Sequence, residues 1–341
     1  MFLLFCRVEQ MQKHTPIKKY YFLIAAAILI IILLPLIIFL YSKKESKQKK
    51  EIHFINTAEW TAPDTATIPQ TKEGDLIKYG RSLIINTAYY LGPKGTIAHI
   101  SNGMNCDNCH MNAGTKLWAN NFSAVKAKYP LYRNRSSSIE TIQMRINACF
   151  ERSLNGKKLS ENSKEMAAIM AYINWVGQGV TKASKIVGTG SEILPFIDEP
   201  ADSARGRILF ISKCQLCHGA NGEGKSGDYN GYVYPPLWGN HSYNNGAGMY
   251  ELSKLAGYIK NNMPYGADSK KPVLTDRESW DIAAYINSNP RPVYKDLKND
   301  WHNISTKPVD YPFGPYSDTF SQKQHKYGPF NPIALAHKNK K

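Results

Sequence analysis

Two copies of one five-residue pattern constrain this chain more than any other feature. CDNCH occupies residues 106–110 and CQLCH occupies residues 214–218, so both copies read C-x-x-C-H. Two thiols about one helical turn apart can reach the two vinyl groups on one porphyrin edge, and the adjacent histidine then faces the iron. The sequence therefore predicts two covalently bound haem c groups. The attachment residues are Cys106, Cys109, Cys214 and Cys217, and the first iron ligands are His110 and His218.

Two other functions of paired cysteines fit this pattern poorly. A zinc ribbon places its two cysteine pairs roughly 15–20 residues apart, whereas Cys109 and Cys214 are separated by far more than that. A thioredoxin-like site requires a βαβ context, and the sequence shows no strand pattern of that kind. Both alternatives are weaker than haem attachment.

A long uncharged segment lies near the N-terminus. Tyr20–Tyr41 reads YYFLIAAAILIIILLPLIIFLY, which is 22 residues without a charge, and a helix of this length spans a bilayer core. The segment exceeds the apolar core of a cleavable signal peptide, and no small-x-small cleavage site follows it. We therefore expect an uncleaved transmembrane helix, with a cleaved signal as the alternative. A start at Met11 would leave this segment intact.

Lysines lie on both sides of this segment, so the charge distribution does not orient it. Haem c is attached outside the cytoplasm, and the two motifs therefore place the N-terminus inside and the bulk of the chain outside. The expected location is the cell inner membrane, with a single membrane pass and the haem-bearing part on the periplasmic side.

The chain is strongly basic. Its 43 lysines and arginines exceed its 27 acidic residues, which gives a net charge of +16 at pH 7. Beyond residue 50 the basic residues are scattered and form no nucleic-acid motif, which argues against DNA or RNA as a partner. The excess instead indicates an acidic partner protein or an anionic substrate.

The body of the chain contains a weak internal duplication. GRSL at residues 80–83 and GRIL at residues 206–209 each precede a haem motif. KEMAAIMAYI at residues 164–173 and ESWDIAAYI at residues 278–286 each follow one, and both contain Ala-Tyr-Ile. Helix, haem motif, long loop and closing helix is the order of a cytochrome c domain, so the sequence predicts two such domains.

The expected fold class is mainly α, because few alternating β-branched runs occur. It consists of two cytochrome c-type domains in tandem with long loops, preceded by one N-terminal transmembrane helix. The predicted boundaries are 1–50 for the membrane anchor and its basic flank, 51–72 for a tether, 73–185 for the first cytochrome c domain, 186–201 for a linker, 202–290 for the second domain, and 291–341 for a Pro/Tyr-rich tail that wraps over the domains.

Each iron needs a second axial ligand from the stretch between its motif and the closing helix. In the second unit the candidates are His241, Met249 and Met263. Met263 precedes a proline in NNMPYG, and a Met-Pro turn just before the last helix presents a thioether in many c-type cytochromes. Met263 is therefore the expected ligand, with the other two as alternatives. YPPLWG at residues 234–239 is expected to supply a proline carbonyl near His218.

The first unit has no histidine between residues 111 and 163, and its candidate sulfurs are Met111, Met144 and Cys149. Met111 directly follows the haem-binding histidine and cannot reach the opposite side of the haem. Apolar residues at helical spacing predict a helix over 139–154 that carries Cys149 near its apolar stripe.

On that helix, Arg145, Cys149 and Ser153 fall on one side, at i, i+4 and i+8. A thiol beside a guanidinium favours the thiolate, which is a credible iron ligand. The residues alone also allow an inert buried cysteine, because free cysteines often pack as small apolar groups.

Several long motifs resemble those of the thiosulfate dehydrogenase family of dihaem c-type cytochromes. The similarity covers roughly residues 73–341. The motifs are NCDNCHMNAGTK, YPLYRNRSSSIETIQMRINACFERSLNGKKL, CQLCHGANGEG, YPPLWGNHSYNNGAGM, NNMPYG and the tail segments YPFGPY and QHKYGPF.

This resemblance implies His110 and Cys149 as axial ligands of the first haem, and His218 and Met263 as those of the second. It also implies that the substrate-binding residues are Arg135, Arg145 and Ser153. Some family members place a lysine directly before the methionine, where it can compete for the iron. This chain has Asn262 there, so a redox-linked Lys/Met exchange is not expected.

The reaction implied by the resemblance is the coupling of two thiosulfates to tetrathionate, or its reversal, with two electrons transferred. Cys149 would be both iron ligand and reaction centre, and its sulfur would carry a transient thiosulfonate adduct. Electrons would pass through the second haem to a redox partner, such as a cytochrome or a membrane electron-transport component. The alternatives are a haem subunit that loads thiosulfate onto a carrier-protein cysteine, and a dihaem electron carrier without chemistry of its own.

Overall fold

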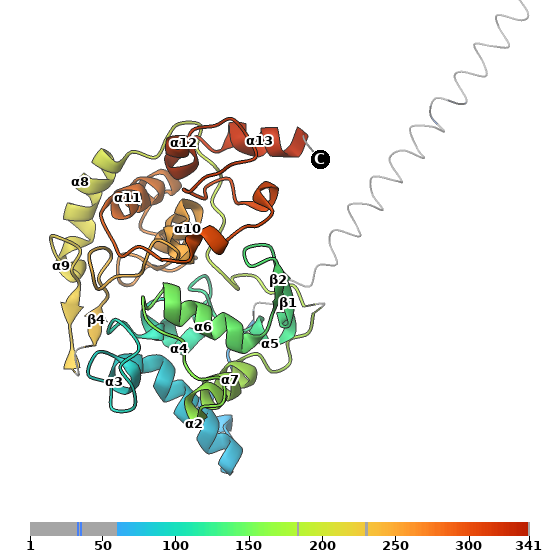
Figure 1. Cartoon of the computed structure of the whole chain (residues 1–341), viewed down its shortest axis with the longest axis vertical. Coiled ribbons are helices and arrows are strands. Elements are labelled where there is room, and N and C mark those ends of the chain that lie inside the picture. The colour runs from blue at the N-terminus through green and yellow to red at the C-terminus, as the bar shows by residue number, and fades with distance from the viewer. Residues whose placement is uncertain (1–32, 34, 36–59, 183, 229–230, 340–341) are drawn as a thin grey trace, which may run out of the picture. The chain divides into compact units, whose positions relative to one another are not determined.

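The computed structural model describes residues 33, 35, 60–182, 184–228 and 231–339 (Figure 1). Nearly all of the predicted anchor, Tyr20–Tyr41, lies outside these residues. In the part of the chain that the structure describes, no helix has the length and apolar character that a membrane crossing requires. The transmembrane helix therefore stays a prediction.

The described residues are mainly helical, as predicted, and they contain two short antiparallel strand pairs, β1–β2 and β3–β4. The α-helices are α2 (Lys72–Ile85), α3 (Thr87–Leu91), α4 (Met111–Gly114), α5 (Val125–Lys128), α6 (Ile142–Arg152), α7 (Lys164–Val176), α8 (Ser203–Lys213), α9 (Gln215–His218), α10 (Leu252–Asn262), α11 (Asp276–Ser288), α12 (Gln322–Tyr327) and α13 (Asn331–Asn339). The strands are β1 (Leu131–Arg133), β2 (Ser138–Glu140), β3 (Lys225–Ser226) and β4 (Tyr232–Tyr234). Short 3-10 turns include η2 (Cys106–Asn108) and η4 (Gly248–Tyr250).

The duplicated segments form the same helix crossing twice. Helix α2 packs on α7, and α8 packs on α11 (Figure 1). A Cβ added to Gly80 would collide with the backbone of α7 and with Tyr172, and a Cβ added to Gly206 would collide with the backbone of α11 and with Tyr285. Glycine therefore allows the two backbones to touch at each crossing, at equivalent positions of the duplicated sequence.

Two hydrophobic cores follow from these crossings. The first core forms around Leu83, Phe150 and Tyr172, and the second forms around Phe210 and Trp280. We call residues 60–182 the first lobe, residues 201–290 the second lobe and residues 291–339 the tail.

Side chains of the second lobe and of the tail pack into the cores of the two lobes. Tyr243 and Ala247 of the second lobe are buried in the first core, and Met249 packs against both cores. In the tail, Phe330 is buried in the second core, and the backbone N–H of Trp301 donates to the carbonyl of Arg135 at 2.7 Å. The lobes are therefore joined by side chains that serve both of them.

Helix α6 begins later than the sequence pattern predicted. The expected range was 139–154, but residues 138–140 form β2, which pairs with β1, and the Ile139 side chain is 65% exposed. The helix begins after Thr141, whose hydroxyl accepts a hydrogen bond from the backbone N–H of Met144 at 3.2 Å. Ile139 fits the helical spacing in the sequence, but in the structure it pairs with Tyr132 across the β1–β2 hairpin. Its match to the helical pattern is therefore coincidental.

Candidate active site

The first haem motif lies on η2 and the turn that follows it. The Nδ1–H of His110 donates to the carbonyl of Asn120, which leaves Nε2 as a free ligand atom. Asn112, Ala113 and Asn120 all have positive φ, at 56°, 55° and 52°. These left-handed residues turn the chain back on itself, so that a carbonyl ten residues downstream orients the imidazole.

The second haem motif repeats this arrangement. The Nδ1–H of His218 donates to the carbonyl of Pro235 at 2.9 Å, which confirms the proline carbonyl expected from YPPLWG. Burial lowers the pKa of His218, so the imidazole is held neutral, as iron ligation requires. Met263 directly follows α10 and is partly buried against the second core. His241 is exposed, and Met249 lines the cavity beside the first motif.

A cavity of about 350 Å³ opens beside the first motif, within the usual size range for cofactor sites. Cys106, Cys109 and His110 converge on it. Its walls are largely apolar; they include Ile84, Met104, Phe122, Ile146, Ile169 and Ile173. Two thiols and one imidazole that meet in an apolar cavity fit a covalently attached haem.

Cys149 is the one of the three candidate sulfurs in the first lobe that lines this cavity. Met144 is 41% exposed on the outer side of the helix. Arg145 lies one helical turn before Cys149 on α6, and its charge acts on the thiol. The structure thus places this sulfur in the same cavity as the first haem motif.

The charge around Cys149 distinguishes it from the attachment cysteines. Burial raises the pKa of Cys149, but the Arg145 charge, the His110 hydrogen bond and the Arg133 charge outweigh it and lower the pKa to about 7. Burial raises the pKa of both Cys106 and Cys109 to about 12. Of these three thiols in one cavity, Cys149 alone is stabilised as the thiolate.

Arg145 and Ser153 line the same cavity as Cys149, on the face of α6 that their spacing predicted. Ser153 caps the C-terminal end of the helix. The charge of Cys149 is the main cause that raises the pKa of Arg145, which is therefore a firmly held cation beside the thiol. No ion pair of Arg145 with a carboxylate occurs in the described part of the chain.

Arg135 also lines the cavity, but its guanidinium is already engaged. One Nη atom forms an ion pair with Glu251, and the other donates to the carbonyl of Gly246 at 2.9 Å. The rings of Trp301 and Tyr311 lie 5.6 and 6.0 Å from its central carbon. Arg135 thereby connects the first lobe to the second lobe and to the tail.

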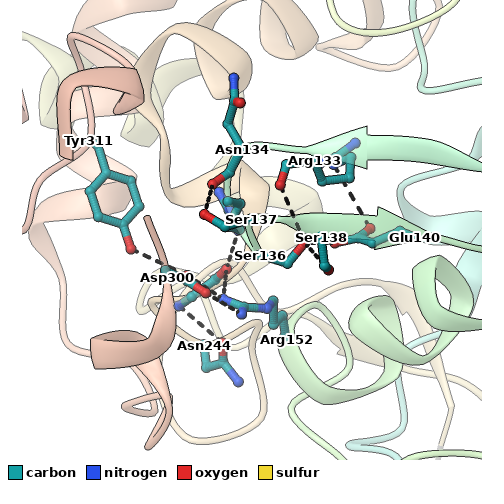
Figure 2. A network of polar contacts seen from close by, with 12 residues as sticks. Arg133, Asn134, Ser136, Ser137, Ser138, Glu140, Arg152, Asn244, Asp300 and Tyr311 are labelled. Carbon is teal, nitrogen blue, oxygen red and sulfur yellow. Dashed lines mark hydrogen bonds and ion pairs between the residues drawn. The ribbon is translucent and has the colours of Figure 1, made fainter. Parts of the chain in front are cut away.

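Arg152 is a cavity residue that the sequence did not suggest. It forms a two-pronged ion pair with Asp300 of the tail, with N–O distances of 2.8 and 2.7 Å (Figure 2). It also donates to the carbonyl of Gly246 at 3.1 Å, the same acceptor that Arg135 uses. Tyr311 donates to the Asp300 carboxylate from the other side at 3.4 Å (Figure 2).

Arg133, on β1, is a second cavity residue that sequence reasoning missed. Its Nε lies 3.9 Å from the carboxylate of Glu140, which also accepts a 2.7 Å hydrogen bond from Ser136 (Figure 2). With a side chain 36% exposed, Arg133 has the longest ion pair of the three cavity arginines that face a carboxylate. A prediction of the β1–β2 hairpin from the sequence could have identified Arg133, because side chains alternate between the two faces of a strand.

The cavity lining as a whole is electropositive. Among the described residues that line it, five side chains are cationic and three are carboxylates: Arg133, Arg135, Arg145, Arg152 and Lys254, against Glu140, Glu251 and Asp300. This excess of positive charge in a partly apolar cavity favours an anionic ligand.

Comparisons with known proteins identify two family domains. The model described as SoxA/TsdA, cytochrome c domain, matches residues 97–181, and the model described as cytochrome c matches residues 203–290. A thiosulfate dehydrogenase of Psychrobacter arcticus is 39% identical over 241 residues, which cover 71% of each chain. A thiosulfate dehydrogenase of Allochromatium vinosum is 36% identical over 248 residues, which cover 72% of this chain and 88% of the relative.

A solved structure shows the same similarity. The thiosulfate dehydrogenase TsdBA from Marichromatium purpuratum, in its as-isolated form, superposes with a TM-score of 0.64 at 34% sequence identity. The match covers 69% of this chain and 50% of that chain. Together with two cores built around two C-x-x-C-H motifs, these similarities show that the chain belongs to the thiosulfate dehydrogenase family and carries two covalently bound c-type haems.

Proposed function

We propose that this chain oxidatively couples two thiosulfates to tetrathionate. The observation that carries the proposal is the position of Cys149, in the first haem cavity beside Arg145, with a thiol pKa lowered to about 7. The names of the relatives, which are 36–39% identical, support thiosulfate as the substrate.

The charge of the cavity suits this substrate. Thiosulfate is a dianion, so bringing two of them together requires positive charge against their mutual repulsion. We assign this task to Arg145 and to Arg133, because neither is held in a close ion pair. Ser153 adds a hydroxyl donor for a sulfonate oxygen. Arg135, which the family resemblance implies as a substrate residue, acts here mainly by holding the cavity wall to Glu251.

The proposed chemistry centres on the Cys149 sulfur. The thiolate forms a sulfur–sulfur bond with the sulfane sulfur of the first thiosulfate, which yields Cys–S–S–SO₃⁻ and releases two electrons. The second thiosulfate attacks the outer sulfane sulfur of that adduct, forms tetrathionate and restores the thiolate as leaving group. Arg145 neutralises charge in both steps, because it faces the thiolate that is consumed and then regenerated.

The bound haems supply one-electron acceptors for the two electrons released. We propose that His110 and Cys149 would hold the iron of the first haem, and that His218 and Met263 would hold the iron of the second. The second lobe then delivers the electrons to a redox partner such as a cytochrome. We further propose that the chain is anchored by Tyr20–Tyr41 in the inner membrane, with both lobes in the periplasm.

The test compares Cys149→Ala with Met144→Ala in purified, haem-loaded protein. With thiosulfate, ferricyanide and no carrier protein, we expect tetrathionate to form with the wild type and with the Met144 variant, whose side chain faces outward on the same helix. The Cys149 variant should lose at least about 1,000-fold in turnover, the scale of losing a covalent nucleophile.

Turnover by the Cys149 variant at the wild-type rate would refute the proposal. Wild-type protein that forms tetrathionate only when a carrier protein is added would favour the haem-subunit alternative. Rates with tetrathionate and a reduced dye would establish whether the reverse reaction also occurs.

A further inference from the structure

The loop that follows the first haem motif, residues 111–120, contacts the ligand regions of both haems. At one end, the carbonyl of Asn120 orients His110. In the middle, the Lys116 ammonium donates to the carbonyl of Ala267 at 3.3 Å, and the carbonyl of Trp118 accepts from the Asn262 amide at 3.1 Å. The last two contacts cross from the first lobe to the second.

These two crossing contacts bracket Met263. Asn262 precedes the methionine and Ala267 follows it by four residues; both are buried, with exposed fractions of 2% and 3%. Two of the residues between them are open to solvent: Tyr265 is 93% exposed, and a Cβ added to Gly266 would meet no neighbouring atom. We call residues 262–267 the methionine loop. Its middle is exposed, and its two ends contact residues of the other lobe as well as their own.

The supporting loop is itself firmly shaped. Trp118 and Asn120 both have positive φ, 60° and 52°, which for non-glycine residues persists only where the surroundings determine the conformation. The backbone N–H of Trp118 is fixed by the carbonyl of Gly188 at 2.8 Å. The Lys116 ammonium also lies 4.0 Å from the sulfur of Met111, the residue directly after His110. Residues 111–120 thus contact both His110 and the two ends of the methionine loop.

We propose that Lys116 and the Trp118 carbonyl clamp the methionine loop, so that the first lobe positions the Met263 thioether on the iron of the second haem. This inference rests on the proposed ligation of that iron by Met263. Lys116 acts as a positioning residue, because its observed contact in the second lobe is with the loop backbone. The ligation of the electron-transfer haem then depends on the catalytic lobe.

The test replaces Lys116 by methionine, which keeps the length of the side chain and removes its charge and its donors. Lys271→Met is the matched control, because it removes an exposed lysine charge four residues beyond Ala267. Lys116→Arg restores a charged donor. All proteins are haem-loaded, and three readouts are compared: the near-infrared band of ferric haem with methionine ligation, the affinity for added imidazole that displaces the methionine, and the reduction potential of the second haem.

We expect Lys116→Met to weaken the methionine band, to raise imidazole affinity about ten-fold or more, and to lower the potential of the second haem. Lys271→Met should match the wild type, and Lys116→Arg should recover most of the difference. The thiolate signature of the first haem should be the same in all four proteins.

Two results would overturn the inference. If the wild type shows the methionine band and Lys116→Met retains the band, the potential and the imidazole affinity, Met263 is the ligand but the clamp does not position it. If the wild type lacks the band, the proposed ligation fails and the clamp with it. Should Lys116→Met not accumulate, Lys116→Gln is measured by the same readouts against the same two criteria.

Discussion

Arg135 and Arg145 line one cavity, and the structure predicts that their removal has different consequences. The comparison uses Arg135→Gln and Arg145→Gln, which remove the same charge. Arg135 is 15% exposed and paired with Glu251, which is 4% exposed. Arg145 has no carboxylate partner of this kind in the described residues and faces the Cys149 sulfur instead.

For Arg135→Gln, the expected loss is in stability. Removing one partner of a buried ion pair costs about 3–5 kcal/mol. Lys254 remains 2.8 Å from the other Glu251 oxygen, so we expect the lower end of that range. For a chain of this size, about 3 kcal/mol corresponds to a fall of about 4–5 °C in Tm.

For Arg145→Gln, the expected loss is in catalysis. Two charge-assisted hydrogen bonds to a sulfonate are each worth about 1.5–3 kcal/mol, so kcat/KM for thiosulfate should fall about 100-fold or more. Its Tm should change little, because no carboxylate is left unpaired. The assays are steady-state thiosulfate oxidation at constant ionic strength and thermal unfolding of the ferric protein.

The opposite pattern would refute this reasoning. If Arg135→Gln keeps its Tm and loses kcat/KM as strongly as Arg145→Gln, then the Arg135 guanidinium faces the substrate and its contacts with Glu251 and Gly246 are not structural. Lys254→Gln is a useful comparison, because it removes the half-exposed partner of the same carboxylate and should cost less stability than Arg135→Gln.

Three further predictions concern the helices and the charge of the cavity. Gly80→Ala and Gly206→Ala should each destabilise the protein by about 1–2 kcal/mol, because overpacking against a helix backbone outweighs the roughly 1 kcal/mol gain in helix propensity. Denaturant unfolding measures this loss. Gly190→Ala is the control and should leave stability unchanged, because a Cβ at Gly190 meets no neighbouring atom. Thr141→Ala removes the N-cap of α6 and should cost about 1 kcal/mol, seen as a lower denaturation midpoint; an unchanged midpoint would contradict the cap. Raising the ionic strength should raise KM for thiosulfate and leave kcat nearly constant, since salt screens the attraction of a dianion; a salt-independent KM would argue against electrostatic capture.

Local patterns in the sequence predicted a large part of the haem sites. The C-x-x-C-H spacing, the Pro235 carbonyl near His218 and the face shared by Arg145, Cys149 and Ser153 all depend on residues within one helix or one short loop. Periodicity and motif spacing encode such arrangements directly. The range predicted for α6 failed at its start, because strand pairing of residues 138–140 overrode the helical spacing.

The remainder of the cavity depends on contacts between distant segments. Nothing near Arg135 indicates that its partner is Glu251, 116 residues later, or that Arg152 pairs with Asp300, 148 residues later. These pairs arise only when the second lobe and the tail pack against the first lobe. Their effect on the site is large, because they decide which cavity cations are neutralised and which face the Cys149 sulfur.

One carbonyl oxygen limits how such a chain can be recombined. The Gly246 carbonyl receives hydrogen bonds from both Arg135 and Arg152, and a Cβ at this position would crowd Arg152 and Tyr294. A chimera that joins the first lobe to the second half of an unrelated cytochrome would lose this acceptor together with Glu251 and Asp300. Such a hybrid would keep the first haem motif, but Arg135 and Arg152 would lose their partners, so exchanging the second half should disturb the cavity around Cys149.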